Sequence, residues 1–335
     1  MKKKQTILLS FLFCMQTLSQ SASAMTLFGS KKDKKETTKP VPSDYNKLVG
    51  RDTMAIKGLM GVIQKENDYY LEIPKTLIGR EILVSNKLLQ VPQELNEAGV
   101  NKGINYENKT IKFEWEKDLN KLNIREQRLT PEVYSFYAMA PSVKDNYINP
   151  LIASLKIEGV SKDSASVVVK VTNLFNGKDE CLNDVFNLIN LGTSANSELS
   201  RILSMKAFDN NVAATSELTT VVHEGKSKTN ITIVVSTSLI LLPSRPMMGR
   251  LENQRVGYFT TSRLHYGDNQ PEVATKNYIT RWKLEPKDTA AYMRGELVEP
   301  VKPIEFYIDH AVPANILPYI KKGILDWNKA FERAG

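Results

Sequence analysis

Alternating apolar and polar positions dominate the chain from residue 46 onward and predict β-strands rather than helices. Two apolar runs flank the polar residues Lys65–Asp68, which is the pattern of a β-hairpin. Residues 79–89 predict a further strand, and residues 108–129 predict another pair. In that pair, Ile111, Phe113 and Trp115 alternate with Lys112, Glu114 and Glu116. We therefore expect a small β-rich domain over residues 46–130.

From residue 150 the predicted strands become longer and richer in β-branched residues, which favour strands. Residues 211–243 predict two long strands joined at Glu224–Lys228. Their second apolar run, Ile231–Leu242, is too short to span a membrane. Residues 178–190 predict one short helix, and residues 278–288 predict another strand; the helix would bury Leu182, Val185, Phe186 and Ile189. These elements predict a β-rich middle domain over residues 131–290.

The last part of the sequence changes character. Residues 291–302, with Pro300 near their end and Pro303 directly after them, predict a linker, and residues 304–310 alternate as a strand does. Apolar residues then recur every three or four positions from Ile316 to Ala334, which predicts an amphipathic helix with Asn315 as its N-cap. Together these patterns predict an α+β, β-dominated protein whose antiparallel N-terminal domains are followed by one strand and one helix of an incomplete domain, residues 303–335.

The first 24 residues have the three parts of a secretory signal peptide: lysines at the start, an apolar run, and the small residues Ala22-Ser23-Ala24. We expect cleavage after Ala24; the alternative is an uncleaved anchor. Cys14 would leave with the signal, so Cys181 has no partner for an intrachain disulfide and is predicted to be inert. These features predict an exported bacterial protein, located in the periplasm, at the cell surface or outside the cell.

The formal net charge of +8 is concentrated near the N-terminus. Removal of the signal lysines lowers it to +5, and residues 30–39 carry five lysines against Asp33 and Glu36. We interpret residues 25–45 as a basic, proline-containing linker; contact of this segment with anionic lipid is the alternative. The remaining balance gives no support to a nucleic-acid partner.

Motifs for catalysis are missing from the sequence. His223-Glu224 begins an H-E-x-x-H pattern, but Ser227 stands at the second histidine position. The other histidines are His265 and His310. Gly225-Lys226-Ser227 ends as a phosphate-binding loop does, but Thr220 replaces its first glycine. We therefore predict no catalytic, cofactor-binding or metal-ligating residue in this chain.

Six stretches, taken together and in this order, resemble a family of large bacterial secreted zinc-dependent metalloproteases: GREILVSNKL, NPLIASLKIEG, VVVKVTNLF, RVGYFTTS, ITRWKLE and KPIEFYIDHAVPANILPYIKKGILDWNKAFERAG. Members of that family carry two N-terminal domains of unknown function before a metzincin-like catalytic domain. The RVGYF stretch and the final stretch are the most specific. Asn253-Gln254 departs from the family, which tends to have an Asp-Pro-like pair there.

The resemblance implies that residues 303–335 begin the protease domain. Its H-E-x-x-H-x-x-G-x-x-H motif lies downstream of this sequence, so zinc would belong to the full-length parent and this chain alone would be inactive. The partners implied are the catalytic domain and the parent's protein or peptide substrate. Mid-helix Gly323 suggests a close contact with that domain. The sequence leaves open whether the chain is a fragment, a truncated product or a complete protein.

One hypothesis assigns Asp268 a role in latency. His265-Tyr266-Gly267-Asp268 resembles the F-x-G-D segment of astacin propeptides, whose aspartate ligates the catalytic zinc. An ordinary Gly-Asp-Asn turn is the alternative. The competing interpretation of the whole chain is a standalone envelope module that binds glycans or proteins through its β domains.

Overall fold

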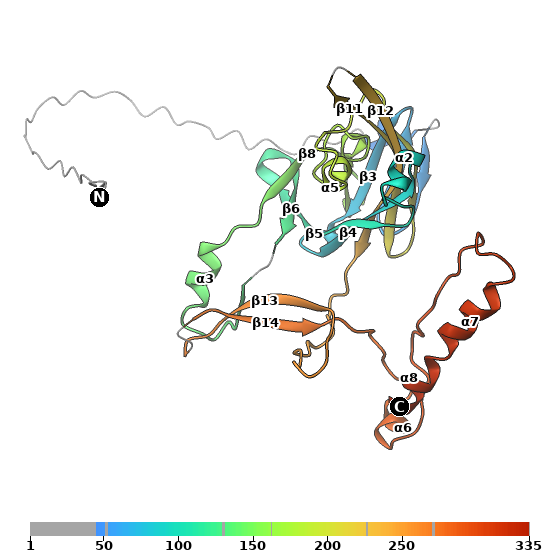
Figure 1. Ribbon diagram of the computed structural model, residues 1–335. Coiled ribbons are helices and arrows are strands. Elements are labelled where there is room, and N and C mark those ends of the chain that lie inside the picture. Colours follow the sequence, from blue (N-terminus) through green and yellow to red (C-terminus); the bar gives the residue numbers. More distant parts are fainter. Residues whose placement is uncertain are drawn as a thin grey trace, which may run out of the picture. The chain divides into compact units, whose positions relative to one another are not determined.

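The computed structural model describes residues 45–50, 53–128, 131–161, 163–225, 227–269 and 272–334. The predicted signal peptide and residues 25–44 of the predicted linker lie outside these residues. The described part is β-dominated, with a large antiparallel sheet, a small three-stranded sheet and few helices (Figure 1). The predicted β-dominated class is therefore confirmed.

The large sheet has eleven strands in the order β1-β2-β3-β9-β8-β6-β5-β4-β12-β11-β10, and every neighbouring pair is antiparallel. Its strands are β1 (Met54–Ile56), β2 (Gly61–Lys65), β3 (Asp68–Pro74), β4 (Glu81–Gln90), β5 (Asn105–Glu116), β6 (Lys121–Gln127), β8 (Leu151–Val160), β9 (Ser166–Lys170), β10 (Arg201–Ala207), β11 (Asn211–Glu224) and β12 (Ser227–Leu241).

Two predicted hairpins are confirmed by the strand pairing. β2 and β3 pair from Gly61↔Glu72 to Lys65↔Asp68, so Glu66 and Asn67 form the turn. β11 and β12 pair along their whole length and turn near residue 225, where exposed His223 lies in an ordinary hairpin. Both hairpins follow from local alternation, because side chains on a strand point to opposite faces in turn.

Strands from the two predicted β-rich regions belong to the same sheet. β4, from residues 46–130, pairs with β12 from Leu83↔Ile240 through Leu88↔Val235. β3 pairs with β9, and β6 pairs with β8. The boundary predicted at residue 130 therefore does not divide this sheet. The reason is that an alternating pattern predicts a strand but does not show which distant strand it pairs with.

The two ends of the large sheet meet at Gly58. The Leu59 backbone N–H donates to the Phe208 carbonyl at 2.7 Å, just beyond the end of β10. A Cβ on Gly58 would lie 2.7 Å from that same carbonyl oxygen and 2.8 Å from the Ala207 Cβ. Glycine is required here because the two backbone segments approach too closely for any side chain.

The Gly58→Ala variant is expected to lower the free energy of unfolding by about 1–3 kcal/mol, because the added methyl group forces the sheet ends apart. Urea denaturation of the purified chain measures this loss. Gly257→Ala is the matched control, since a Cβ at Gly257 meets nothing within 4 Å. Equal stability of the two variants would contradict the close approach.

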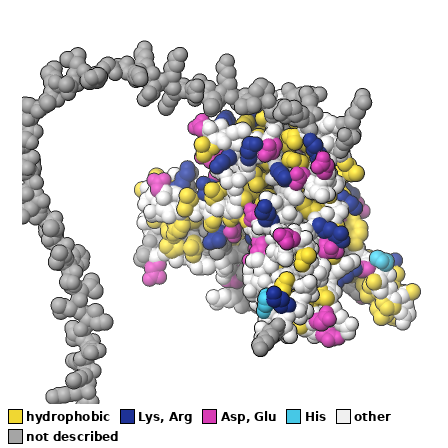
Figure 2. Space-filling model, turned by 90° about the horizontal axis from the view of Figure 1, so that it is seen from above, with side chains coloured by type: hydrophobic (Ala, Val, Ile, Leu, Met, Phe, Trp, Pro, Cys, Tyr) yellow, Lys and Arg dark blue, Asp and Glu magenta, His cyan; other side chains and the backbone are white. Residues whose placement is uncertain are grey.

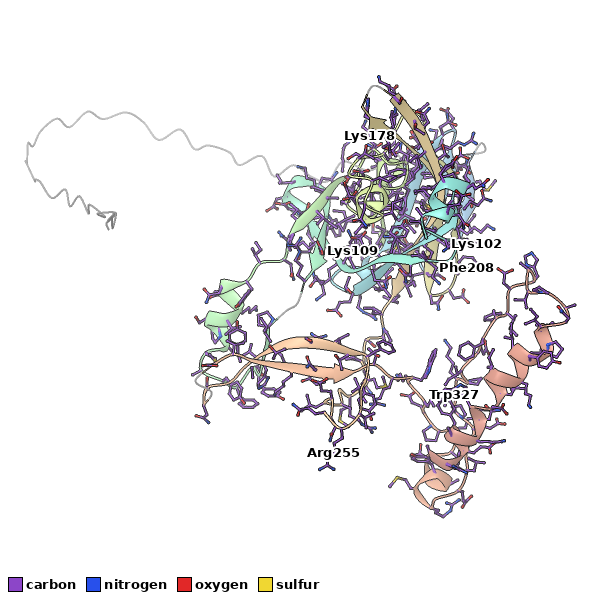
Figure 3. The ribbon with its side chains drawn as sticks, in the orientation of Figure 1. Lys102, Lys109, Lys178, Phe208, Arg255 and Trp327 are labelled. Carbon is purple, nitrogen blue, oxygen red and sulfur yellow. The ribbon has the colours of Figure 1, made fainter. Side chains whose placement is uncertain are left out.

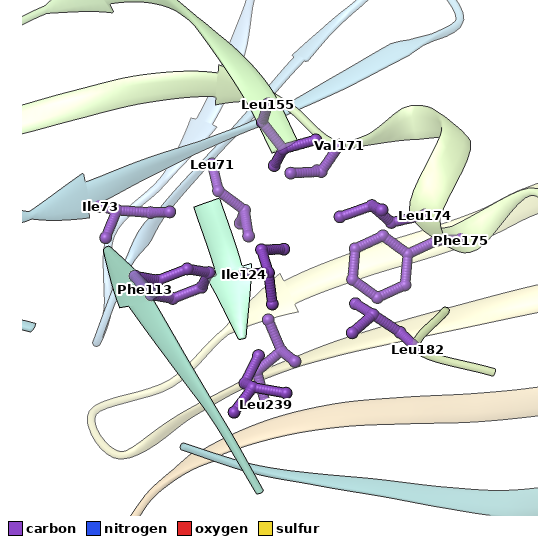
Figure 4. A pocket seen from close by; sticks show the side chains of 11 residues that line it. Leu71, Ile73, Phe113, Ile124, Leu155, Val171, Leu174, Phe175, Leu182 and Leu239 are labelled. Atoms are coloured by element: carbon purple, nitrogen blue, oxygen red, sulfur yellow. The ribbon is translucent and has the colours of Figure 1, made fainter. Parts of the chain in front are cut away.

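The main core lies against the large sheet and draws residues from almost every strand. A gap of only about 10 Å³ remains in it, lined entirely by apolar side chains (Figure 4). These are Leu71, Ile73, Ile111, Phe113, Ile124, Leu155, Val171, Leu174, Phe175, Leu182 and Leu239. A space of this size and polarity is a packing defect rather than a ligand site.

A second core cluster holds residues 182–191 against the sheet. Phe186 is fully buried among Leu88, Leu95, Leu218 and other apolar side chains. The predicted helix here is shorter than expected: α5 covers only Val185–Leu188. Leu182, Val185 and Phe186 are buried as predicted, whereas Ile189 is half-buried.

A buried polar network ties the same segment to β4 and β12. The Asn86 amide donates to the Leu182 carbonyl at 2.8 Å, and its oxygen accepts from the Thr237 hydroxyl at 2.7 Å. The Asn183 amide donates to the Thr237 hydroxyl, and its oxygen accepts from the Tyr106 hydroxyl. Burial raises the pKa of Tyr106, which keeps this phenol a donor. Such a network is stabilising only while each buried group keeps its partner.

The small sheet has the order β14-β13-β7, with β7 (Glu132–Val133), β13 (Thr260–Tyr266) and β14 (Ala274–Ile279). β13 is antiparallel to β14 and parallel to β7. The described helices are α1 (Tyr45–Leu48), α2 (Gln93–Glu97), α3 (Ala140–Asn146), α4 (Thr172–Phe175), α5, α6 (Thr289–Met293), α7 (Leu317–Leu325) and α8 (Asn328–Ala334), with 3₁₀ turns at Lys75–Leu77 and Lys117–Leu119.

Several predictions for the C-terminal part are wrong. Residues 304–310 form no strand, and residues 280–285 do not continue β14. A strand needs a neighbour to accept its backbone hydrogen bonds, and no described strand lies beside residues 304–310. The predicted linker 291–302 begins inside α6 and is held by the bridge between Pro286 and Pro300.

The predicted terminal helix is broken into two, α7 and α8, around Asp326 and Trp327. Its first cap is Ile316 rather than Asn315, and no side chain caps it. A Cβ at Gly323 would meet nothing within 4 Å in the described structure. The close contact expected there with the catalytic domain stays a prediction. Periodicity identified the helical segment, but its exact ends depend on tertiary contacts.

Candidate functional site

Ionisable and aromatic side chains lie close together on the small sheet and on the chain that follows β7. β7 brings Glu132 opposite His265, because these two residues are register partners in the parallel pair with β13. Tyr278 lies on the same face, since its partner Thr261 is four residues before His265 on β13. The pairing therefore unites an acid, an imidazole and a phenol from three separate segments.

His265 is almost completely buried, and its Nδ1 lies 3.4 Å from Glu132 Oε2. Nδ1 makes no hydrogen bond in the described structure. The Tyr278 hydroxyl donates to the same Glu132 oxygen at 2.8 Å, and this bond raises the pKa of the Tyr278 phenol. The Tyr134 ring packs edge-on against His265, with 5.6 Å between ring centroids. The Glu132 side chain thus links β7 to β14 through Tyr278, while strand pairing joins β7 to β13.

An aromatic group continues from this cluster to the surface. Tyr134 and Phe136 stack with their rings 5.4 Å apart and nearly parallel, and Tyr137 meets both rings edge-on. Phe136 is 77% exposed, so one side of the stack faces solvent. On the other face of β13, the hydroxyls of Tyr147 and Tyr266 form a hydrogen bond.

Asp268, the predicted latency residue, lies just after β13 and is exposed. Its Oδ2 accepts from the Ala138 backbone N–H at 2.9 Å, and its Oδ1 accepts from Met139 at 3.3 Å. Asp268 therefore anchors the turn that leads into α3. The neighbouring His265 points into the Glu132 cluster, so the two side chains do not form a shared metal site in this structure.

A groove of about 580 Å³ lies between the extended segment 131–135 and α3. Alternate residues of the extended segment form one wall, and α3 with Tyr147 forms the other. The lining residues are Pro131, Val133, Ser135, Ala140, Pro141, Val143, Lys144, Asp145 and Tyr147. This volume lies within the range typical of ligand pockets, and the lining combines apolar surface with a few polar groups.

The sequence prediction missed this groove. No element was predicted between residues 131 and 149, although Pro141 is one of the first residues of α3, where proline is common. α3 is only seven residues long, which is too short for a convincing apolar period. Glu132 was missed as well, because only the strand pairing brings it to His265.

Metal-ligating residues are not grouped. Within the described part of the chain, no three His, Cys, Asp or Glu side chains lie together as a metal site. His223 and His310 are exposed and His265 is buried. The polar side chains of the groove lining are those of Ser135, Lys144, Asp145 and Tyr147, and they lie beside apolar surface as in sites of non-covalent binding.

Cys181 is expected to react very slowly with thiol reagents in the folded protein. Burial, reinforced by the nearby Asp179 carboxylate, raises the pKa of this thiol to about 12. The thiolate fraction at pH 8 is then roughly a thousandfold below that of an ordinary cysteine. Ellman's reagent with and without urea measures this; equally fast labelling in both conditions would contradict it.

The described structure is thus a β-dominated protein with a ligand-sized groove and no grouped metal ligands. The family model of DUF5117, a domain of unknown function, matches residues 103–287, which is more than half of the chain. The chain belongs to the DUF5117 family. A second model, DUF5118, also a domain of unknown function, matches residues 42–91. Comparison with curated proteins finds no match, and comparison with solved structures finds none.

No described helix is both long enough and apolar enough to cross a membrane.

Proposed function

We propose that this chain is the non-catalytic N-terminal region of a secreted zinc-dependent metalloprotease that hydrolyses proteins or peptides. Two domains of unknown function in tandem, at residues 42–91 and 103–287, match the domain order expected from the resemblance. The stretch after them resembles the first part of a metzincin-like catalytic domain. The function of the chain is then to support or regulate that domain.

The observation that carries this proposal is the exposed apolar surface of residues 303–334. Trp327 is 67% exposed and Tyr319 is 75% exposed, and neither α7 nor α8 contains a buried residue (Figure 3 labels Trp327). Amphipathic helices owe most of their stability to packing of the apolar face. A catalytic domain that continues from these helices supplies the packing partner.

Zinc belongs to the parent in this proposal and not to this chain. A catalytic zinc site needs about three protein ligands and one open position, and the described residues offer no such group. The chain alone therefore holds no stoichiometric zinc and cleaves no protein. In the longer product, the downstream histidine motif would supply the ligands and its glutamate the general base.

Export is part of the same proposal and rests on residues 1–24, which lie outside the described residues. Mass spectrometry of the exported protein tests it directly. An N-terminus at Met25 supports a cleaved signal, whereas an intact Met1 would contradict cleavage.

The decisive experiment is to sequence the DNA that follows the Gly335 codon and to express the longer product. We expect an open frame with the H-E-x-x-H motif, one zinc per chain and hydrolysis of casein, all lost when the motif glutamate is changed to glutamine. The 335-residue chain is the control and should show neither property. A frame without the motif would reject the protease proposal.

The groove beside α3 favours a second candidate, an envelope module that binds glycan or protein ligands. Its 580 Å³ volume and the exposed Tyr134–Phe136 stack are suited to sugar rings or apolar side chains. Binding of the purified chain to a glycan or peptide array, lost in the Phe136→Ala variant, would support this candidate. A stop codon directly after Gly335 would favour it over the protease.

Asp268→Ala is expected to lower the free energy of unfolding by about 1 kcal/mol, because the backbone N–H groups of Ala138 and Met139 lose their acceptor. Asp268→Asn keeps one acceptor oxygen and is the matched control. Urea denaturation measures both variants. Latency is tested separately in the unprocessed full-length protease: increased activity of Asp268→Ala would support it, and unchanged activity would reject it.

A further inference from the structure

A cluster of cations and exposed apolar side chains lies at one end of the small sheet, where β13 begins and β14 ends. The chain from residue 245 to 259 returns to this end and is fixed there by hydrogen bonds. The Thr280 N–H donates to the Phe259 carbonyl at 2.8 Å, the Ile279 N–H donates to the Arg250 carbonyl at 2.9 Å, and Arg281 Nη2 donates to the Met248 carbonyl at 2.9 Å. We call residues 245–259 and 280–283 the arginine tip.

Apolar side chains of the arginine tip are unusually exposed. Phe259 is 89% exposed and Met248 is 85% exposed. Trp282, Leu251 and Val256 are each more than half exposed. None of these residues belongs to either hydrophobic core cluster. Trp282 meets the Phe306 ring edge-on at 6.3 Å between ring centroids, whereas Phe259 and Met248 are almost fully exposed. Large exposed apolar side chains held in one short region indicate an interaction site.

The charge of the tip is strongly positive. Its cations are Arg245, Arg250, Arg255, Arg281 and Lys283. The arginines form no ion pair within the described part of the chain; Lys283 pairs with Glu285. The one acidic side chain inside the tip is Glu252, and its Oε1 accepts a hydrogen bond from the Asn277 amide. Arg255 lies in a turn and its side chain extends away from the loop (Figure 3).

The face shown in Figure 2 offers a contrast, because cationic and anionic side chains are interspersed over it. Interspersed charge is the ordinary state of a protein surface and attracts no particular partner. At the tip, by contrast, four arginines and one lysine share a short stretch of chain with exposed aromatic and thioether side chains and a single acidic residue, Glu252. This combination is typical of proteins that lie on a bilayer: aromatic rings occupy the interface while guanidinium groups contact headgroups.

We propose that the arginine tip docks onto a membrane surface that contains anionic phospholipid, with Phe259 and Met248 entering the interfacial layer. The charge complementarity selects anionic lipid, because each arginine near such a surface strengthens binding about fivefold. The apolar side chains add affinity that salt does not screen. This inference does not depend on the protease proposal, since it concerns only residues of this chain.

The test is sedimentation of the signal-free chain with vesicles of phosphatidylcholine, with and without phosphatidylglycerol. We expect binding only when phosphatidylglycerol is present. The triple variant Arg245→Ala, Arg250→Ala, Arg255→Ala should bind roughly a hundredfold more weakly. Phe259→Ser should weaken binding roughly tenfold, and its loss should persist at high salt.

Two matched triple variants serve as controls. Lys87→Ala, Lys121→Ala, Lys178→Ala removes three exposed cations from the large-sheet region and should leave binding unchanged. Lys31→Ala, Lys32→Ala, Lys35→Ala removes three cations of the predicted N-terminal linker, which is the competing source of lipid affinity. Equal urea midpoints show that every variant is folded.

Each remaining outcome contradicts the proposal. Absence of binding, or equal binding to neutral vesicles, would overturn it. Loss of binding in the linker variant with full binding in the arginine variant would assign lipid affinity to residues 31–35 instead. If the chain does not bind vesicles but binds an acidic protein surface through the same arginines, the arginine tip is a protein interface.

Discussion

Replacing Phe186 by alanine is expected to lower the free energy of unfolding by about 3–5 kcal/mol. Phe186 is fully buried and fills the second core cluster between α5 and strands β4, β11 and β12. Removing the ring leaves a cavity that well-packed neighbours on a sheet can close only in part. This loss is a large fraction of the 5–15 kcal/mol typical of a folded domain.

Urea denaturation followed by circular dichroism measures the change. Leu188→Ala is the matched control on the same short helix, because Leu188 is 42% exposed. The control should lose no more than about 0.5–1 kcal/mol. If both variants lose the same small amount, Phe186 does not anchor residues 182–191.

The second large effect is expected for Asn86→Ala, at about 2–4 kcal/mol. The asparagine side chain is the only described link that joins the Leu182 carbonyl, the Thr237 hydroxyl and β4. Its removal leaves a buried carbonyl and a buried hydroxyl with a missing partner, and each such group costs about 1–3 kcal/mol. The asparagine side chain is small, so the loss of stability comes mainly from the missing hydrogen bonds and only slightly from lost packing.

A double-mutant cycle with Thr237→Val separates the polar contribution from a general loss of packing. The two changes should be clearly non-additive, because they remove the same hydrogen bond. Asn108→Ala is the control, because Asn108 is an exposed asparagine on β5, the strand that pairs with β4. Additive losses in the cycle would show that the network contributes little.

These two residues also explain how residues 182–191 are held in one position on the large sheet. Phe186 and Asn86 hold one connecting segment, residues 182–191, on strands that are far away in sequence. The Tyr106 hydroxyl joins the same segment through Asn183. An apolar contact and a satisfied polar network therefore fix the segment that contains α5 on the sheet.

Hairpins were the most predictable part of the fold. The β2–β3 and β11–β12 turns follow from alternation and turn residues alone, since both partners of each pair are adjacent in the chain. The burial of Leu182, Val185 and Phe186 was predicted although the helix around them was overestimated. Apolar side chains are buried whatever backbone carries them, whereas a helix of four residues depends on its surroundings.

The candidate site was only partly predictable. Asp268 was singled out by a resemblance, and the structure shows it accepting two backbone N–H groups instead of standing free. Glu132 and the groove beside α3 gave no sequence signal. The aromatic residues within Tyr134–Tyr137 were a visible signal in the sequence. However, aromatic residues of a surface stack and of a buried core have the same composition, so the sequence could not distinguish the two.

What the sequence by itself determined is the class of structure: strands from residue 54 onward, the principal hairpins, and an amphipathic stretch at residues 316–334. These follow from side-chain period and turn chemistry, which act over a few residues. Only the tertiary structure decided that β4 pairs with β12, that Gly58 lies against Phe208, and that Glu132 meets His265. Such contacts join residues more than a hundred positions apart, and their free energy comes from partners that a local pattern does not contain.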